Sequence, residues 1–192
     1  MLGRRRTEGL EARWDAAVQL SAHDDALLRV GKASKKVLDF YSEAAHLTSL
    51  TSKTISQLCE QVCVDRLIMA DRLVLTGDKL MRTRPVEYRS AVSRYYYAMY
   101  HSVRAVVYYA HGGDDHQAHS TLPSNLPKDF PSHSIWLNDL KDARSFRNDA
   151  DYDPYPFADS DWKPVAADLA TKAPLLAKEA RLYLRKKGCG GV

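Results

Sequence analysis

Apolar residues recur every three or four positions along most of this 192-residue chain. That spacing places them on one face of a helix, whereas no segment shows the strict alternation of a half-buried strand. The clearest stripe lies between Pro85 and about Ala110, and it comprises Tyr88, Val92, Tyr95 or Tyr96, Met99, Val103, Val106 and Ala110. The chain is therefore predicted to be all-α, with this stripe facing the core of a bundle.

Interruptions of this pattern set the expected domain limits. The helical pattern starts near Thr7, and a hydroxyl-rich stretch fills residues 47–54. Because hydroxyl side chains compete for backbone hydrogen bonds, such a stretch favours caps and turns. We expect an N-terminal helical extension over residues 1–53, a four- to five-helix up-and-down bundle over residues 54–187, and a flexible tail over residues 188–192.

Glycines and prolines indicate where the helices end. Gly77 is expected to shorten or break one long helix, and Pro85 suits the first turn of the next, where its missing N–H costs nothing. Residues 111–132 form a loop rich in glycine, proline and histidine that exceeds the usual connection length, so it is either functional or mobile. Polar loops collect such histidines freely, and we predict neither a metal nor a cofactor. A further helix ends near Tyr152, before two prolines.

Charge and cysteine usage limit the compartment and the partners. The formal net charge of +4 allows an anionic partner without requiring one, and residues 79–104 are mainly basic whereas residues 149–161 are mainly acidic. The three cysteines form neither an even disulfide framework nor a C-x-x-C pair. The Arg4–Arg6 cluster is not followed by an apolar run of signal-peptide length, and no stretch approaches the about 20 apolar residues of a membrane span. We expect a cytoplasmic protein without a membrane segment.

Two helical faces mix cationic and aromatic side chains. In the 85–110 helix, a second stripe with helical spacing comprises Arg94, Tyr97, His101, Arg104 and Tyr108. This stripe is either a buried hydrogen-bond network that fixes the helix register or a surface for an anionic ligand. In the next helix, Arg144, Arg147 and Asp151 share a face, and Arg147 lies one turn beyond the apolar stripe. An arginine aimed at a bundle seam needs an anion, which is either Asp151 or a phosphate.

Three segments resemble the HEPN family. Residues 90–101, Ser-Ala-Val-Ser-Arg-Tyr-Tyr-Tyr-Ala-Met-Tyr-His, are similar to a helix of its bundle. Residues 147–153, Arg-Asn-Asp-Ala-Asp-Tyr-Asp, resemble its Arg-x-x-Ala-Asp-Tyr motif, and His119 with Ser120 resembles a His-Ser at the corresponding point. The resemblance covers about residues 58–187 and implies a bundle that forms a homodimer.

For function, the resemblance implies a toxin-like, metal-independent ribonuclease in a toxin-antitoxin or defence context, paired with a minimal nucleotidyltransferase antitoxin. Such ribonucleases use an arginine, a polar residue and a histidine; Arg147 and Asn148 match, whereas Tyr152 stands where the histidine is expected. Cleavage then depends on Tyr152 as a hydrogen-bond donor or acid, or on the imidazole of His101. The residues expected to hold RNA phosphates are Arg94, Arg104, Arg144 and Tyr97.

Because Tyr152 stands in place of the histidine that the family's ribonucleases use, other hypotheses about function stay open. A catalytically silent HEPN module would bind RNA, a nucleotide or a nucleotidyltransferase partner. Tyr152 also resembles a tyrosine that accepts AMP in some family pairs, a modification that would add negative charge and repel RNA. The remaining interpretation is a structural dimer subunit whose polar cluster fixes the packing.

Overall fold

The structure is a computed structural model that describes residues 22–192, and within that range every regular element is a helix. The all-α prediction is therefore confirmed. The expected start of the first helix near Thr7 and the Arg4–Arg6 cluster lie outside the described residues. Among the described helices, none is both long enough and apolar enough to cross a membrane.

The chain divides into two units, residues 1–53 and residues 54–192. The described part of the first unit contains α2 (Ala22–Lys32) and α3 (Lys35–Thr51), and the Ser34 hydroxyl caps α3 by accepting a hydrogen bond from the Val37 N–H. Neither helix has a buried side chain. The large apolar side chains that both helices leave exposed are Leu27, Leu28, Val30, Leu38, Phe40, Tyr41 and Leu50.

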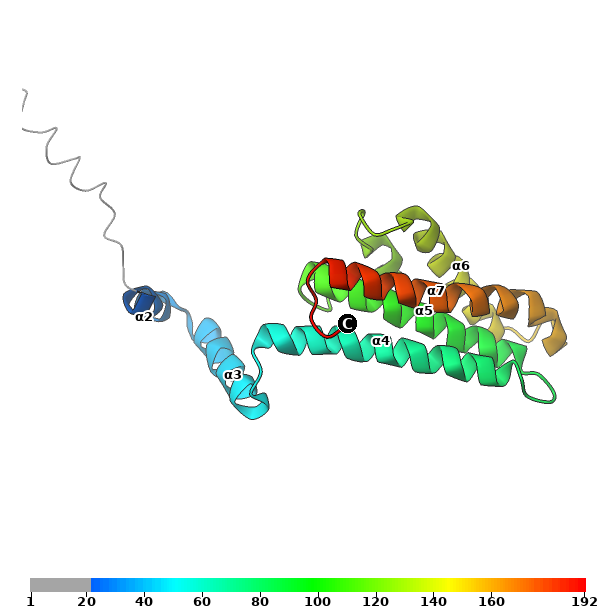
Figure 1. The fold of residues 1–192 in the computed structure, drawn as a ribbon, viewed down its shortest axis with the longest axis horizontal. Coiled ribbons are helices and arrows are strands. Elements are labelled where there is room, and N and C mark those ends of the chain that lie inside the picture. Colours follow the sequence, from blue (N-terminus) through cyan, green and yellow to red (C-terminus); the bar gives the residue numbers. More distant parts are fainter. Residues whose placement is uncertain (1–21) are drawn as a thin grey trace, which may run out of the picture. The chain divides into compact units, whose positions relative to one another are not determined.

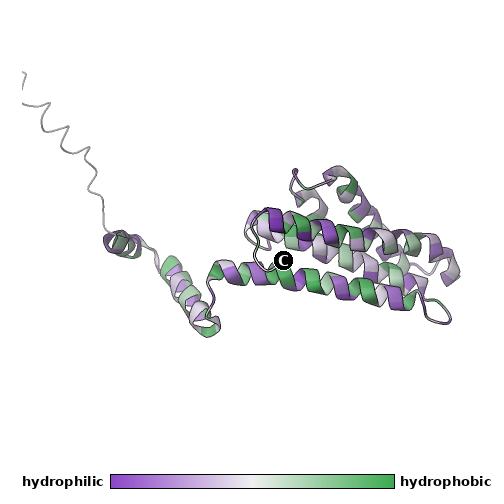
Figure 2. Cartoon of the chain, viewed as in Figure 1, coloured by the Kyte–Doolittle hydropathy of each residue, from purple (hydrophilic) through white to green (hydrophobic). Residues whose placement is uncertain are grey.

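The second unit is a helical bundle (Figure 1). Its elements are α4 (Ile55–Leu80), α5 (Tyr88–His111), η1 (Leu122–Asn125), α6 (His133–Tyr152), η2 (Asp159–Trp162) and α7 (Lys163–Lys186). A reciprocal capping box between Thr54 and Gln57 starts α4 and satisfies backbone N–H groups that the helix leaves without partners. Figure 2 shows hydrophobic and hydrophilic residues interleaved along each bundle helix, as expected for helices with one face in a core.

Helix α5 is the centre of the bundle and packs against α4, α6 and α7. Most of the predicted stripe is fully buried, including Val92, Tyr95 and Met99, although Ala110 is exposed. A second face of small residues, Ala91, Ala98 and Ala105, is also fully buried. Because α5 has two apolar faces, neighbours cover it on several sides, which explains why its polar residues lie close to side chains of other elements.

Two expectations at helix ends were wrong. Helix α4 runs through Gly77 without a break, because the missing side chain admits the Tyr95 ring of α5: a Cβ at this position would lie 2.6 Å from Tyr95 Cε1. Helix α5 begins at Tyr88 rather than at Pro85. Its first turn is capped from a distance by the Asp159 carboxylate, which accepts hydrogen bonds from the backbone N–H groups of Tyr88 and Arg89 at 2.6 and 3.1 Å.

The long loop and the C-terminal tail both pack against the bundle. In the loop, Leu122, Leu126 and Phe130 are buried, and η1 contacts α5 and α6. In the tail over residues 188–192, Cys189 is buried, and the Gly190 N–H donates to Glu60 of α4 at 3.1 Å. The expected flexibility of this tail stays a prediction.

Candidate functional site

Arg147 on α6 is held by three neighbours on its inner side. Its Nη2 donates to the Tyr97 hydroxyl at 2.5 Å, and its Nη1 donates to Asn148 Oδ1 at 3.0 Å. Its Nε lies 2.8 Å from Asp151 Oδ2, one turn later on the same helix. The Arg147 side chain is only 18% exposed. The guanidinium is therefore fixed in orientation at the seam between α5 and α6.

The internal pair between Arg147 and Asp151, one of the two alternatives for this arginine, is present. Asp151 also accepts a hydrogen bond from the Ser93 hydroxyl of α5 at 2.7 Å, so its charge is shared between two donors. The contact with Arg147 is an ion pair without hydrogen-bond alignment, since the buried Nε has no hydrogen-bond partner among the described residues. The ion pair helps to position the guanidinium.

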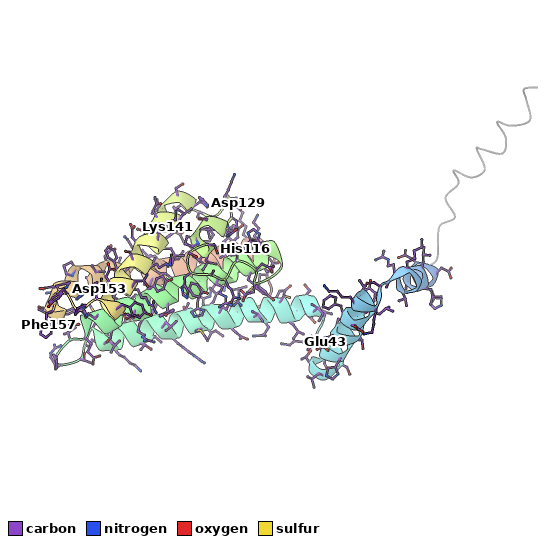
Figure 3. All side chains as sticks on the ribbon, turned by 180° about the vertical axis from the view of Figure 1, so that it is seen from behind. Glu43, His116, Asp129, Lys141, Asp153 and Phe157 are labelled. Atoms are coloured by element: carbon purple, nitrogen blue, oxygen red, sulfur yellow. The ribbon has the colours of Figure 1, made fainter. Side chains whose placement is uncertain are left out.

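Tyr152 lies at the outer side of this arginine. Its ring centroid is 5.4 Å from the Arg147 guanidinium carbon, and the residue is 72% exposed. The chain then turns away from α6 through a connection in which Tyr155 and Phe157 are also exposed. Asp153 and Phe157 mark this end of the bundle in Figure 3. The phenol that replaces the expected histidine is thus accessible to a ligand or to another protein.

His119 is the functional candidate that the predicted site residues did not include. It reaches from the long loop to α5, where its Nδ1 lies 2.5 Å from the Tyr96 hydroxyl and its ring stacks on Tyr100 with 4.1 Å between centroids. Its ring also meets Tyr97, the partner of Arg147, edge-on at 6.0 Å. Its resemblance to a family His-Ser was the one signal in the sequence, because nothing in the loop's pattern predicts where it packs.

Partial burial of the ring and nearby arginines disfavour protonation of the His119 imidazole, although the residue as a whole is exposed. Burial lowers its pKa below the ordinary 6.5, and the positive charges of Arg147, Arg144 and Arg104 lower it further. Burial likewise raises the pKa of Tyr96, so its phenol stays protonated and hydrogen-bonded to the imidazole. An imidazole near arginines can accept a proton while an anion is bound beside it.

His101 lies in a different environment on α5. Its ring meets the edge of Tyr100 at 5.2 Å, and its buried Nδ1 has no hydrogen-bond partner among the described residues. Burial, followed by the charges of Arg104, Arg66 and His119, lowers the pKa of His101 to about 4. His101 lines a pocket with Arg66 and Arg104, and its role as a source of the catalytic imidazole stays a prediction.

The remaining predicted phosphate-binding residues differ in their surroundings. Arg94 is exposed on α5. Arg144 is partly buried near Tyr96, and its positive charge lowers the pKa of Tyr96, although burial of Tyr96 raises that pKa by more. Arg104 donates from Nε to Asp114 Oδ1 at 2.9 Å and from Nη2 to Gln117 Oε1 at 2.7 Å. Arg104 and Arg144 thus lie near tyrosine rings of α5.

Metal-binding geometry is absent from residues 22–192, where no three His, Cys, Asp or Glu side chains come together as a site for a metal ion. Cys59, Cys63 and Cys189 are free thiols. Burial raises the pKa of Cys63 to about 12, which makes it a poor nucleophile and a poor metal ligand.

The fold and this arrangement define an all-helical bundle protein with an arginine, tyrosine and histidine cluster at the α5–α6 seam. Comparison with known families agrees with this class: the family model for the HEPN domain matches residues 69–173, more than half of the chain. The chain belongs to the HEPN domain family. No curated protein matches the sequence.

Proposed function

We propose that this HEPN domain protein is a toxin-like, metal-independent endoribonuclease whose RNA-cleaving face is centred on Arg147. One observation carries the proposal: the guanidinium of Arg147 and the imidazole of His119 both lie next to Tyr97. Arg147 donates to the Tyr97 hydroxyl at 2.5 Å, and the His119 ring lies 6.0 Å from the Tyr97 ring. An arginine to stabilise phosphate charge and an imidazole to move a proton are the groups that RNA cleavage requires.

In the proposed reaction, the 2′-oxygen of a ribose attacks the adjacent phosphorus, and the bond from phosphorus to the 5′-oxygen of the next nucleotide breaks. His119 Nε2 takes the proton of the 2′-hydroxyl when Nδ1 carries the ring proton and donates it to the Tyr96 oxygen. Arg147 stabilises the charge on the non-bridging oxygens. The exposed phenol of Tyr152 donates a proton to the leaving 5′-oxygen and regains one from solvent, and the His119 imidazolium releases its proton to solvent. The products are a 2′,3′-cyclic phosphate and a 5′-hydroxyl.

Cleavage of tRNA or mRNA by the purified full-length protein in the presence of EDTA tests this proposal. We expect Arg147→Gln and His119→Asn each to slow cleavage by at least about 100-fold, as expected for loss of charge stabilisation and of a general base. Lys141→Gln is the matched control, since it removes an exposed positive charge from the same helix (Figure 3). If the wild type leaves RNA intact, or if Arg147→Gln cleaves as fast as the wild type, the protein is not this ribonuclease. RNA binding without any product would support the silent module instead.

The exposure of Tyr152 favours a second candidate function, acceptance of AMP from a minimal nucleotidyltransferase partner. The phenolic oxygen would attack the α-phosphorus of ATP, forming the oxygen–phosphorus bond as pyrophosphate leaves and the phenol proton passes to solvent. The new phosphate would lie next to Arg147, whose guanidinium carbon is 5.4 Å from the ring, and would exclude RNA phosphates by repulsion and by occupying the arginine.

Mass spectrometry after incubation with ATP and a purified minimal nucleotidyltransferase tests this second function. We expect one added AMP, lost in Tyr152→Phe and retained in Tyr155→Phe. Tyr155 is a matched control because it is 75% exposed, as accessible as Tyr152, but lies beyond the end of α6. Modification of Tyr155, or of neither tyrosine, removes this function.

A further inference from the structure

A pocket with charged and apolar lining residues lies between α4 and α5, beside the cluster already described. Its volume is about 250 Å³, and its lining residues are Val62, Asp65, Arg66, Met69, His101 and Arg104. This volume is below the about 300–1,000 Å³ of pockets for drug-sized ligands, so it suits a group the size of a phosphate with part of a sugar. We refer to it as the Arg66 pocket.

One of the lining residues has a buried nitrogen atom without a hydrogen-bond partner among the described residues, Nδ1 of His101. The buried Nη1 of Arg66 is ion-paired with Asp114. Buried polar atoms in folded proteins are nearly always hydrogen-bonded, and exceptions mark a functional group or the place of an ion. The unpaired nitrogen of His101 therefore indicates a ligand that hydrogen-bonds to it in this pocket.

Two guanidinium groups and two carboxylates lie around the pocket. Arg66 and Arg104 share one carboxylate, that of Asp114, and Arg66 Nη1 lies 3.2 Å from it. The hydrogen bond from Arg104, together with the charge of Arg66, holds the pKa of Asp114 below its ordinary 3.8. Asp65 is the opposing acidic group in the lining, and Gln61 donates to it at 3.0 Å.

The Arg66 guanidinium is also positioned for a flat, two-point contact. Its carbon lies 4.7 Å from the centroid of the Tyr108 ring, and the side chain is only 15% exposed. A guanidinium held against an aromatic ring presents its N–H groups in a fixed plane, which matches the oxygens of a phosphate. Val62 and Met69 supply an apolar wall on which a ribose can rest.

We propose that the Arg66 pocket binds a phosphate group of RNA through Arg66, Arg104 and His101, next to the site at Arg147. The inference rests on the proposed function, which identifies RNA as the ligand. A row of rings joins the two arginine sites: Arg104 lies 5.8 Å from the Tyr100 ring, Tyr100 stacks on His119 at 4.1 Å, and His119 meets Tyr97 at 6.0 Å. A strand bound in the pocket is thereby held beside the imidazole that the proposed cleavage uses.

Binding of a non-cleavable 2′-O-methyl oligonucleotide, of AMP and of inorganic phosphate to the full-length protein tests the pocket. We expect Arg66→Gln to weaken oligonucleotide binding about tenfold, which corresponds to about 1.4 kcal/mol. Asp65→Asn should strengthen it, because it removes the opposing charge. Arg72→Gln should leave affinity unchanged, since Arg72 is an exposed arginine of the same helix outside this pocket. A gain of affinity in Asp65→Asn cannot result from misfolding, so the test does not depend on one variant.

The outcomes separate this inference from the proposed function. If Arg66→Gln and Arg72→Gln bind all three ligands with equal affinity, the Arg66 pocket does not bind phosphate, even if RNA cleavage persists and depends on Arg147. An Arg66-dependent affinity for the oligonucleotide supports the pocket, even if no RNA is cleaved. A dependence seen only with AMP and phosphate overturns the assignment to an RNA strand and identifies a free nucleotide as the ligand.

Discussion

Replacing His101 by glutamine should remove much of the pH dependence of folding stability below neutral pH. The groups facing this imidazole are Arg66 and Asp65 of α4, Arg104 of its own helix, and His119 of the loop. Burial and the positive neighbours disfavour the protonated ring, so the pKa of His101 falls from 6.5 to about 4 on folding. The unfolded chain therefore binds a proton at a pH where the folded chain does not.

The sign and size of the effect follow from that difference. Between about pH 6.5 and pH 4 the unfolded state is favoured increasingly as the pH falls, so stability decreases on acidification and no further loss from this group occurs below about pH 4. Moving from about pH 7 to about pH 5 should lower the free energy of unfolding by about 2 kcal/mol through this group alone. His119 adds to the loss in the same direction, because its pKa is also lowered.

Urea unfolding followed by far-UV circular dichroism at the two pH values measures this contribution. The wild type should lose about 2 kcal/mol more than His101→Gln does, and because His119 is present in both, the difference isolates His101. Inorganic phosphate that occupies the Arg66 pocket should reduce the loss, since an anion favours the imidazolium. If the wild type and the variant lose the same stability on acidification, His101 is not a buried neutral imidazole and the argument fails.

Three further predictions concern packing, capping and the site. Gly77→Ala should lower the free energy of unfolding by about 1–3 kcal/mol in chemical denaturation, because its Cβ would lie 2.6 Å from Tyr95, whereas Gly31→Ala, with no atom within 4 Å, should not. Asp159→Ala should lower it by about 0.5–2 kcal/mol, because α5 loses the acceptor for two backbone N–H groups; an unchanged urea midpoint would refute this cap. Tyr97→Phe should reduce kcat/KM for RNA about tenfold or more at unchanged thermal stability, since Arg147 loses the partner that orients it; equal kinetics would show that Arg147 needs no such partner.

The sequence predicted the helices well because their signals are local. Apolar spacing located α5 and its buried stripe, and two prolines located the end of α6 at Tyr152. The sequence did not predict the contacts between distant segments of the chain. Nothing near Pro85 indicates that Asp159 caps α5. Glycine at position 77 predicts a helix break from its local propensity, whereas its neighbour Tyr95 is brought close only by the fold.

The same difference applies to the candidate site. Helical spacing identified Arg147, Asp151 and Tyr97 as residues of two facing stripes, and the structure joins them directly. The motif on α6 and the stripe on α5 do not indicate that a histidine of the loop packs against them. His119 comes from a loop whose path depends on buried residues such as Leu122 and Phe130, and loop paths are not encoded in any periodic pattern.

The central claim is that Arg147 and His119 act together on RNA, and end-group analysis of a defined RNA tests it most directly. In EDTA, the full-length wild type should produce fragments with 2′,3′-cyclic phosphate and 5′-hydroxyl ends. The dependence on pH should have its acid limb below pH 6.5, because the pKa of His119 is lowered. His119→Asn and Arg147→Gln should give no such fragments. Cyclic-phosphate products from His119→Asn at the wild-type rate would contradict the account.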